Sequence, residues 1–380
     1  MKRRLLFIST IFPSVVANKH ATYNIQALQG LLTNFDIDVI NPIPWHLKMK
    51  ERIPARYSVN GLNVYHPTYW YPPGFLRSQY GWFYYLSIKC CVARLAKERK
   101  PDVVYSSWLY PDGWVASKIA ASLAVPSILD AIGTDANRLT KDSSVANKTV
   151  KAIARSKITI CVSGALKRKL AEIGADTSKL TVLYRGIDRN IFHKMDEIAL
   201  RQEFGFATKD VLVLYVGNLL KTKGLDELAD AFNTLSKKPQ FLNAKLIIAG
   251  SGRYEENFKH RLKTLGLLGR LVFMGSCALP KVAKLMNVAD VVCLPSYSEG
   301  RPNVVVEALC CNAKVVATDV GGTPELMEFH RNLYLVPAKD SCLLAKAIFN
   351  ALNAQCVKDN ADDIDSWEEY SRKLAFYFEK

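Results

Sequence analysis

The stretch from Pro295 to Glu325 decides the fold, and it reads PSYSEGRPNVVVEALCCNAKVVATDVGGTPE. The apolar run 291–294 just before it predicts a buried strand that ends where this stretch begins. A helix is expected over Asn303–Cys311, with Asn312 in the left-handed position that often follows a helix. A second apolar run comes next. Strand, loop, helix and strand in this order are typical of a doubly wound α/β sheet.

Two carboxylates stand eight positions apart in this stretch. Glu299 falls in the loop before the expected helix, and Glu307 falls about one turn inside it. Pro302 is expected at the first helical position, because its fixed φ suits that place. The free N–H groups of the first turn carry the positive end of the helix dipole. The pattern predicts an anion site flanked by two acceptors for hydroxyl groups, and a sugar nucleotide offers that combination.

The stretch resembles the glycosyltransferases of family four, which are retaining enzymes recognised by a Glu, seven residues, Glu signature. The resemblance implies the GT-B fold, in which two Rossmann-like doubly wound domains face a central cleft. In that family the first Glu faces the donor sugar and the second binds the nucleotide ribose, and Glu299 and Glu307 match these places. The resemblance covers nearly the whole chain and is strongest from Val211 to Pro337. The alternative for the two carboxylates alone is a pair of solvated charges.

The resemblance implies a hexosyltransferase that moves a sugar from a nucleotide diphosphate sugar to a polysaccharide or a polyprenyl-linked acceptor. The chain is most similar to enzymes of exopolysaccharide, colanic acid or teichuronic acid assembly. Two other classes stay open. One is a non-catalytic sugar-nucleotide-binding or scaffold protein, and the other is a sugar-nucleotide epimerase of the same fold.

Strand and helix patterns alternate through both halves of the chain, which is long enough for two cores. We expect an acceptor-binding Rossmann-like domain over 1–186 and a nucleotide-sugar-binding one over 187–365. The amphipathic tail 366–380 is expected to form a helix that crosses back to the first domain. In the linker, Arg185 stands where family members usually have Asn.

The resemblance also implies which residues contact the donor. Lys223 matches a lysine that grips the diphosphate, whereas Asn218 stands where the family usually has a cation. The expected donor-binding residues are Gly217, Asn218, Lys223, Gly250, Met274, Glu299, Gly300, Arg301, Pro302, Asn303 and Glu307.

On the acceptor side, the segment 105–113 resembles a family segment in which the position of Ser107 usually carries His. A serine does not act as a base at neutral pH without a partner, so this departure weakens the case for transfer. The expected catalytic residues are Glu299, Lys223 and Ser107. The expected acceptor-binding residues are Trp108, Asp112, Gly133 and Asp135. His20 lies near the expected diphosphate, as a substitute ligand or as an ordinary surface residue.

The net charge of +16 is uneven, because residues 1–190 hold 27 Lys and Arg against 12 Asp and Glu. Ten aromatic residues also fall between Tyr65 and Tyr85. Aromatic rings beside cations suit an anionic membrane surface. We expect peripheral membrane contact and no nucleic-acid partner. Single-stranded nucleic acid is the runner-up, and core packing with charge for solubility is the plain alternative.

No cofactor or metal is expected, because lysine and helix N-termini can balance a diphosphate. The pair Asp36 and Asp38 falls inside a strand pattern and is expected to be structural. Nine cysteines without a Cys-x-x-Cys pair suggest reduced thiols and a cytoplasmic protein at the inner face of the membrane. The apolar start of the chain is too short for a signal peptide, and no run of about 18 apolar residues predicts a membrane span.

Overall fold

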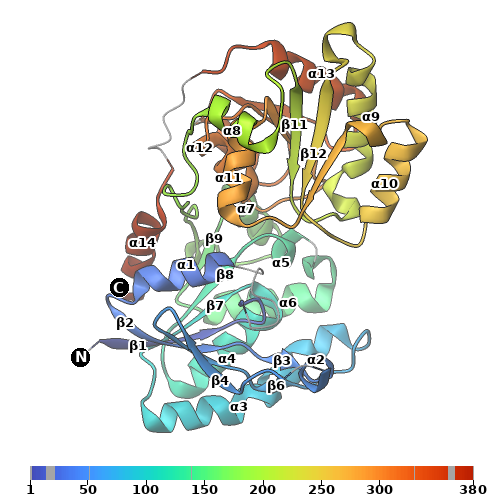
Figure 1. The fold of residues 1–380 in the computed structure, drawn as a ribbon. Helices are drawn as coiled ribbons and strands as arrows, with labels where there is room; N and C mark the ends of the chain where they lie inside the picture. Colours follow the sequence, from blue (N-terminus) through green and yellow to red (C-terminus); the bar gives the residue numbers. More distant parts are fainter. Residues whose placement is uncertain are drawn as a thin grey trace. The chain divides into compact units, whose positions relative to one another are not determined.

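The computed structural model describes residues 2–13, 22–50, 52–137, 139–328, 330–357 and 364–379. The chain forms two compact α/β units. Unit 1 comprises Met1–Gly186 together with Trp367–Lys380, and unit 2 comprises Ile187–Ser366 (Figure 1). Each unit has its own sheet and its own hydrophobic core. His20 lies outside the described residues.

The main sheet of unit 1 has eight strands in the order β10-β9-β8-β7-β1-β2-β5-β4. All neighbours are parallel except β4 and β5, which form an antiparallel hairpin at one edge. The strands are β1 (Arg3–Ile8), β2 (Phe35–Ile40), β4 (Arg56–Val59), β5 (Leu62–Tyr65), β7 (Val103–Ser107), β8 (Ser127–Ala131), β9 (Ile158–Cys161) and β10 (Leu180–Val182). The short strands β3 (Ile43–Pro44) and β6 (Thr68–Tyr69) pair separately.

Helices cover both faces of this sheet, because alternate side chains of each buried strand point to opposite faces. In β1, Leu6 and Ile8 join one apolar cluster, whereas Leu5 and Phe7 join another. The first cluster includes residues of α3, α4 and α6, and the second includes residues of α1 and α14. The helices are α1 (Thr22–Leu31), α2 (Trp45–Lys50), α3 (Tyr80–Glu98), α4 (Trp114–Leu123), α5 (Thr134–Asn137), α6 (Ser143–Arg155), α7 (Gly164–Glu172) and α14 (Trp367–Glu379).

The last helix, α14, packs on α1 within unit 1. Phe378 is buried and its ring contacts Phe35 and Tyr105 with centroids 5.5 and 5.4 Å apart. Its backbone carbonyl accepts a hydrogen bond of 2.9 Å from Arg3. Figure 1 shows both ends of the chain at this part of unit 1. The apolar face of the tail is therefore part of the unit 1 core.

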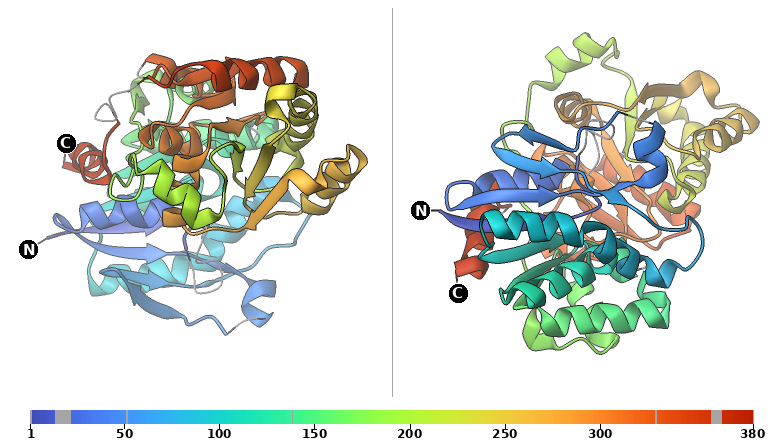
Figure 2. Two further views of the ribbon diagram at one scale, coloured as in Figure 1. Left: turned by 45° about the horizontal axis from the view of Figure 1, so that its top comes forward. Right: turned by 90° about the horizontal axis from the view of Figure 1, so that it is seen from below.

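The sheet of unit 2 has six parallel strands in the order β13-β12-β11-β14-β15-β16. The strands are β11 (Val211–Val216), β12 (Ala244–Ala249), β13 (Leu271–Gly275), β14 (Val291–Leu294), β15 (Val315–Thr318) and β16 (Leu333–Val336). The helices are α8 (Glu197–Phe204), α9 (Leu225–Ser236), α10 (Glu255–Thr264), α11 (Leu279–Val288), α12 (Asn303–Cys310) and α13 (Ser341–Asn353). Figure 2 shows helices on both sides of this sheet. The doubly wound fold predicted for both halves is confirmed.

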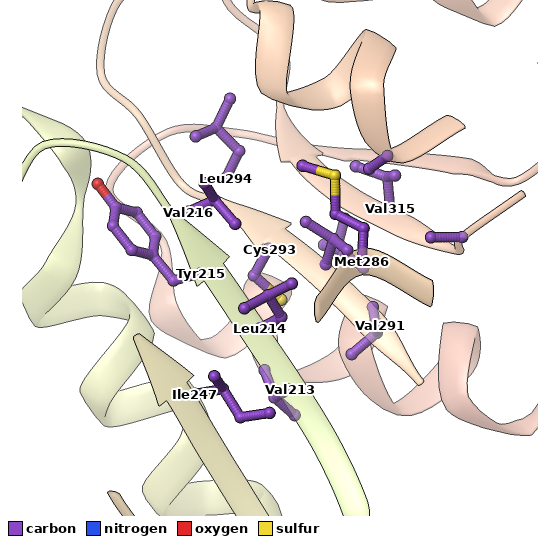
Figure 3. Packing of buried hydrophobic residues seen from close by; sticks show 14 of the residues in the cluster. Val213, Leu214, Tyr215, Val216, Ile247, Met286, Val291, Cys293, Leu294 and Val315 are labelled. Atoms are coloured by element: carbon purple, nitrogen blue, oxygen red, sulfur yellow. The ribbon is translucent and has the colours of Figure 1, made fainter. Parts of the chain in front are cut away.

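The core of unit 2 centres on β11 and β14, where the strand order reverses. Val213 pairs with Val291, and Leu214 pairs with Val292. Figure 3 shows Leu214, Cys293 and Met286 close together in this core, and all three are at most 1% exposed. Ligands of open α/β sheets bind outside the carboxyl ends of the strands at such a reversal. The loops after β11 and β14 are therefore the place to look for a site.

The aromatic stretch between Tyr65 and Tyr85 divides between the core and the surface of unit 1. Tyr65, Tyr69 and Tyr84 of the aromatic stretch are buried in the core of unit 1, whereas Trp70 and Phe75 are exposed. The stretch is therefore part core and part surface. Among the described residues no helix combines the length and the apolar character needed to cross a bilayer. All nine cysteines are free thiols.

Asp36 and Asp38 each form an ion pair with an arginine. Asp38 forms a buried ion pair of 2.6 Å with Arg4, and Asp36 forms an exposed one of 2.6 Å with Arg99. The structural role expected for the pair agrees with these contacts.

Candidate active site

The loops after four strands of unit 2 pack backbone against backbone at the carboxyl edge of the sheet. A Cβ on Gly250 would lie 1.9 Å from the carbonyl oxygen of Gly217, which joins the loops after β12 and β11. A Cβ on Gly321 would lie 2.0 Å from the carbonyl oxygen of Glu299, which joins the loops after β15 and β14. The Gly322 N–H donates to the Gly300 carbonyl at 2.7 Å. Glycine is thus needed for chain packing at this edge, and not only for the approach of a ligand.

A third such contact places Lys223. Gly224 has φ +69°, and a Cβ there would lie 1.9 Å from the Pro295 carbonyl oxygen. The Tyr297 N–H donates to the Thr222 carbonyl at 2.9 Å. The turn after β11 is therefore fixed against the loop after β14, and the side chain of Lys223 extends beside Glu299.

Lys223 and Glu299 form an ion pair, with Nζ 2.6 Å from Oε1. The two side chains are 24% and 14% exposed, so the pair is accessible from one side and shielded from the rest. Two residues 76 positions apart, both expected at the donor, are brought together. A lysine in this place can neutralise a phosphate, and a carboxylate beside it can accept hydrogen bonds from sugar hydroxyls.

Helix α12 begins at Asn303, as its expected range does, but Pro302 is not part of it. Pro302 has φ −74° and ψ 112°, so it is the N-cap and not the first helical residue. Its carbonyl accepts from Val305 N–H at 3.1 Å, which starts the helix. The helix ends at Cys310, one residue before the expected Cys311, and Asn312 has the expected left-handed φ of 56°. The first turn contains no acidic side chain, so its free N–H groups present partial positive charge next to Glu299.

Glu307 lies in the second turn of α12, on a half-buried position. Burial raises the pKa of its carboxyl to about 7, because the surroundings stabilise the charged form less than water does. A carboxyl with this pKa changes charge near neutral pH. Perturbed titratable groups of this kind cluster at functional sites, although buried structural groups show them as well.

The other expected donor residues line the same edge with unequal exposure. Asn218 is exposed, and its carbonyl accepts from the Tyr215 hydroxyl at 2.9 Å. Met274 and Arg301 are half-buried, Gly300 is buried and Asn303 is exposed. Gly250 is tied to the strand that carries Met274, because its N–H donates to the Gly275 carbonyl at 2.7 Å. Met274 lies near the end of β13, and the others lie in loops at the carboxyl ends of the strands or at the start of α12.

Tyr297 was not singled out from the sequence, and it lies two residues before Glu299. Its hydroxyl donates to both carboxylate oxygens of Glu227 at 2.8 and 2.9 Å. The ammonium of Lys339 lies 5.2 Å from its ring centroid. One aromatic in a loop gives no signal in the sequence, because the partner residues are 70 and 42 positions away.

In unit 1, the residues expected at the acceptor are mostly buried. Asp112 is fully buried and accepts hydrogen bonds from the backbone N–H and the hydroxyl of Thr10. Burial raises the pKa of the Asp112 carboxyl to about 7. Ser107 is fully buried, and its hydroxyl has no hydrogen-bond partner among the described residues. The indole N–H of Trp108 is likewise buried without a partner among them.

Asp135 holds the loop after β8 in shape. Its carboxylate accepts from the N–H groups of Gly133 at 2.7 Å, Leu109 at 3.1 Å and Ile132 at 3.2 Å. Gly133 has φ 144°. These contacts join the loops after β7 and β8, and the expected acceptor contact of Asp135 stays a prediction.

A pocket of about 920 Å³ lies beside the segment 109–113 of unit 1. Its lining includes Tyr71, Tyr80, Tyr110, Arg77 and Lys141, and also Asp142, whose carboxylate caps α6. Tyrosine rings suit the apolar faces of sugar rings, and cations suit phosphate. None of the four residues expected at the acceptor lines this pocket.

Arg185, which replaces the usual Asn, forms a buried ion pair with Asp130 at 2.8 Å. Its guanidinium also lies 4.0 Å from the ring centroid of Tyr23 in α1. Arg185 therefore connects the segment after β10 to β8 and to α1. The departure was visible in the sequence, but its partners were not. Within the described part of the chain no group of three or more His, Cys, Asp or Glu is arranged to hold a metal ion.

Comparison with known families gives two matches that together span most of the chain. Residues 196–374 match the model "Glycosyl transferases group 1", and residues 55–190 match "Glycosyltransferase Family 4". A protein of Bacillus subtilis (strain 168) named as a candidate teichuronic acid biosynthesis glycosyltransferase is 31% identical over 95% of this chain and 92% of its own. An N-acetyl-alpha-D-glucosaminyl L-malate synthase of Bacillus anthracis is 26% identical over 70% of each chain.

Solved structures share the fold at lower identity. HepE of Anabaena, solved with UDP and glucose, superposes with a TM-score of 0.76 at 20% identity and covers all of both chains. Sucrose-phosphate synthase of Thermosynechococcus elongatus gives a TM-score of 0.76 at 16% identity, over 99% of this chain and 95% of its own. These similarities identify the two-domain GT-B fold.

Proposed function

Since the chain belongs to family four of the glycosyltransferases, we propose that it transfers a hexose from a nucleotide diphosphate sugar with retention of configuration. The observation that carries this proposal is the Lys223–Glu299 ion pair in front of the first turn of α12. One cation and several free N–H groups face the place where a diphosphate fits. In this proposal Glu299 and Glu307 accept hydrogen bonds from hydroxyl groups of the donor.

In this proposal the donor-binding residues stabilise the negative charge of the leaving diphosphate. Lys223 moves from Glu299 to the diphosphate, and the N–H groups of α12 balance the charge that grows there. Glu299 then accepts hydroxyls of the donor sugar, and Glu307 accepts ribose hydroxyls. The bond between sugar C1 and the phosphate oxygen breaks, the acceptor oxygen bonds to C1, and its proton passes to the released diphosphate. This step asks for no nucleophile and no base at Ser107.

We place the acceptor in unit 1. The pocket of tyrosines with Arg77 and Lys141 suits a glycan that carries a phosphate, such as a lipid-linked saccharide. Because the Bacillus subtilis relative is named for teichuronic acid biosynthesis, we assign this chain to cell-surface polysaccharide synthesis. Trp108, Asp112, Gly133 and Asp135 stay the proposed acceptor contacts, and the carboxylate of Asp135 also fixes the loops after β7 and β8.

We also propose that unit 1 rests on an anionic membrane at the cytoplasmic face. Seven of the fourteen exposed large hydrophobic side chains of the described residues fall within residues 47–86. They are Leu47, Met49, Trp70, Phe75, Leu76, Trp82 and Leu86. That segment is about a tenth of the chain, so half of these side chains are concentrated there. Residues 1–190 carry a net charge of +15, which favours an anionic surface.

A second candidate function is sugar-nucleotide binding without transfer. It is favoured by Asn218 and Ser107, which stand where the family has a cation and a histidine. A thermal-shift screen of nucleotide sugars, followed by a donor hydrolysis assay on those that bind, separates the two. A transferase binds a nucleotide sugar and hydrolyses it slowly without acceptor, and Glu299→Gln should abolish the hydrolysis. Binding without any hydrolysis would leave the scaffold role.

Addition of EDTA should leave turnover of the nucleotide sugar unchanged, because Lys223 and the first turn of α12 balance the charge of the diphosphate.

A further inference from the structure

Unit 1 holds another pocket, of about 490 Å³, at the edge where α2 and α3 meet the end of β5. Its polar and charged lining includes Lys48, Tyr65, His66, Ser87, Cys90 and Arg94. Ser87, Cys90 and Arg94 follow a spacing of three and four residues, so they lie along one stripe of α3. Neither the donor site nor the tyrosine pocket includes any of these residues.

The two cations of this pocket have no acidic partner among the described residues. The Lys48 ammonium donates to the His66 carbonyl at 2.5 Å, and no carboxylate of the described residues lies within 4 Å of it or of the Arg94 guanidinium. Partial burial lowers the pKa of Lys48, and the neighbouring Cys91 offsets this lowering only in part. An anion in the pocket would offset the remainder.

Exposed apolar side chains lie next to residues of this pocket in α2 and α3, and at Trp70. Leu47 and Met49 flank Lys48 in α2 and are 42% and 77% exposed. Leu86 precedes Ser87 in α3 and is 53% exposed. The Trp70 N–H donates to the Ser87 hydroxyl at 3.0 Å, and the Trp70 ring is 59% exposed and stacks on Trp45.

We propose that the pocket of Lys48 and Arg94 binds the phosphate of an anionic phospholipid headgroup, while the apolar side chains around it enter the membrane interface. This inference rests on the membrane association proposed for unit 1, and it assigns the site that recognises the lipid. A phosphate diester carries one negative charge and acceptor oxygens for both cations. A free phosphate fits the cations as well, but it leaves Met49, Trp70 and Leu86 exposed to water. These exposed apolar side chains beside the pocket residues therefore favour the lipid.

The test compares two double variants that lose the same charge from the same region. Lys48→Gln with Arg94→Gln removes the cations of the pocket. Lys89→Gln with Lys97→Gln removes two exposed cations of α3 that do not line it. Co-sedimentation is measured with vesicles that contain phosphatidylglycerol. The first variant should bind at least tenfold more weakly than the wild type, and the second should lose less than about threefold. Equal losses, or no loss from the pocket variant, would overturn the assignment.

If the double variant does not fold, single variants serve instead. Arg94→Gln should lose more vesicle binding than Lys89→Gln, and both side chains are exposed, so neither change should disturb the core.

The Cys90 thiol reports which source of phosphate fills the pocket. It is exposed and lines the pocket, whereas the exposed Cys342 of unit 2 is an internal reference. Phosphatidylglycerol vesicles should slow alkylation of Cys90 relative to Cys342. Inorganic phosphate at millimolar concentration should slow it little. Full protection by inorganic phosphate, with no vesicle binding, would mean a soluble phosphate site and would overturn the lipid assignment.

Failure of this inference is separable from failure of the proposed function. Donor hydrolysis in solution depends on Lys223, Glu299 and α12, so the Lys48 and Arg94 variant should hydrolyse the nucleotide sugar at the wild-type rate. Normal hydrolysis with unchanged vesicle binding would remove the lipid site and leave the transferase. Loss of hydrolysis in that variant would contradict the separation of the two sites and with it this assignment.

Discussion

The charge state of Glu307 should affect the affinity for a nucleoside diphosphate. Its carboxyl has a pKa raised to about 7 by burial, and ribose hydroxyls donate to the ionised form. The ionised fraction falls as pH drops through about 7, so nucleoside diphosphate affinity should fall by about tenfold between pH 8 and pH 6. Glu307→Gln should weaken binding at pH 8 and remove that part of the pH dependence. Calorimetry of both proteins at the two pH values measures it, and parallel pH profiles would take Glu307 out of the site.

Lys223 should act on the diphosphate and hardly at all on the nucleoside. Lys223→Ala should cost about 2 kcal/mol of nucleoside diphosphate binding, the range for a hydrogen bond to a charged group. Lys221→Ala is the matched control, because Lys221 is an exposed lysine of the same turn. The difference in affinity for nucleoside diphosphate and nucleoside, measured for each variant, isolates the phosphate contact. Equal losses for both ligands would mean that Lys223 supports the loop and not the phosphates.

Arg185 should be a large contributor to the stability of unit 1. Breaking a buried ion pair leaves an uncompensated charge, which costs about 3–5 kcal/mol, so Arg185→Ala should lower the melting temperature of the protein. The exposed pair of Arg99 and Asp36 has a shorter distance of 2.6 Å, yet Arg99→Ala should cost less than about 1 kcal/mol. Differential scanning calorimetry of both variants tests the contrast. Comparable shifts would show that burial of the Arg185–Asp130 pair has no special effect.

At the residue scale, the sequence predicted which residues belong to the candidate site but not which residues they contact. The spacing of Glu299 and Glu307 was legible because both fall within one loop and one helix. The contact of Glu299 with Lys223 depended on a resemblance, since 76 residues separate them. The partners of Arg185, Asp112 and Tyr297 were not legible at all, because each contact joins segments far apart in the chain. Side-chain partners across a fold leave no local pattern.

At the scale of elements, the glycines of unit 2 fix the loops that carry the site. Gly224→Ala places a Cβ 1.9 Å from the Pro295 carbonyl oxygen and should push the Lys223 turn away from Glu299. Gly266→Ala is the matched control, because Gly266 has nearly the same φ of +71° and nothing within 4 Å of its Cβ position. Both should lose about 1 kcal/mol of stability from the left-handed backbone. Only Gly224→Ala should also lose nucleotide affinity in calorimetry, and equal affinity in the two variants would contradict the assigned role.

The elements themselves were largely predictable. β-Branched runs and helix signals located every strand of the unit 2 sheet and every strand of the main unit 1 sheet except β4, and they placed Asn312 in the left-handed position after α12. Errors fell at boundaries, where Pro302 proved to be the N-cap. The segment Pro324–Glu328 forms a 3₁₀ helix, and the Thr323 hydroxyl before it is buried without a partner among the described residues. Caps depend on a few dihedral angles, which composition does not determine.

At the scale of the whole molecule, the two units differ in net charge and in the number of exposed apolar side chains. Unit 1 carries the excess of positive charge, and its residues 47–86 hold half of the exposed large apolar side chains of the described residues, whereas unit 2 carries the residues proposed to bind the donor. Aromatic content alone did not separate core from surface, since Tyr84 is buried and Trp70 is exposed. Both have ring side chains in the same 20-residue stretch, and only the fold decides which of them faces water.

The exposed rings should give membrane binding a part that salt does not remove. Trp70→Ser with Trp82→Ser should lower the fraction that stays on anionic vesicles at 0.5 M salt, because rings at the interface are not screened as charges are. Tyr84→Ser is unsuited as a surface probe, since it removes a core side chain. Sedimentation at low and high salt measures both parts. Tight, salt-sensitive binding to single-stranded nucleic acid without vesicle binding would contradict the membrane role.

The most direct test of the central claim is to follow sugar release from nucleotide sugars by proton NMR, before the product anomers equilibrate. The wild-type protein should release nucleoside diphosphate from at least one nucleotide sugar, and the first sugar product should keep the anomeric configuration of the donor. Glu299→Gln and Lys223→Ala should be inactive while they remain folded. A first product of inverted configuration, or no turnover of any nucleotide sugar that the wild type binds, would contradict retaining transfer at this site.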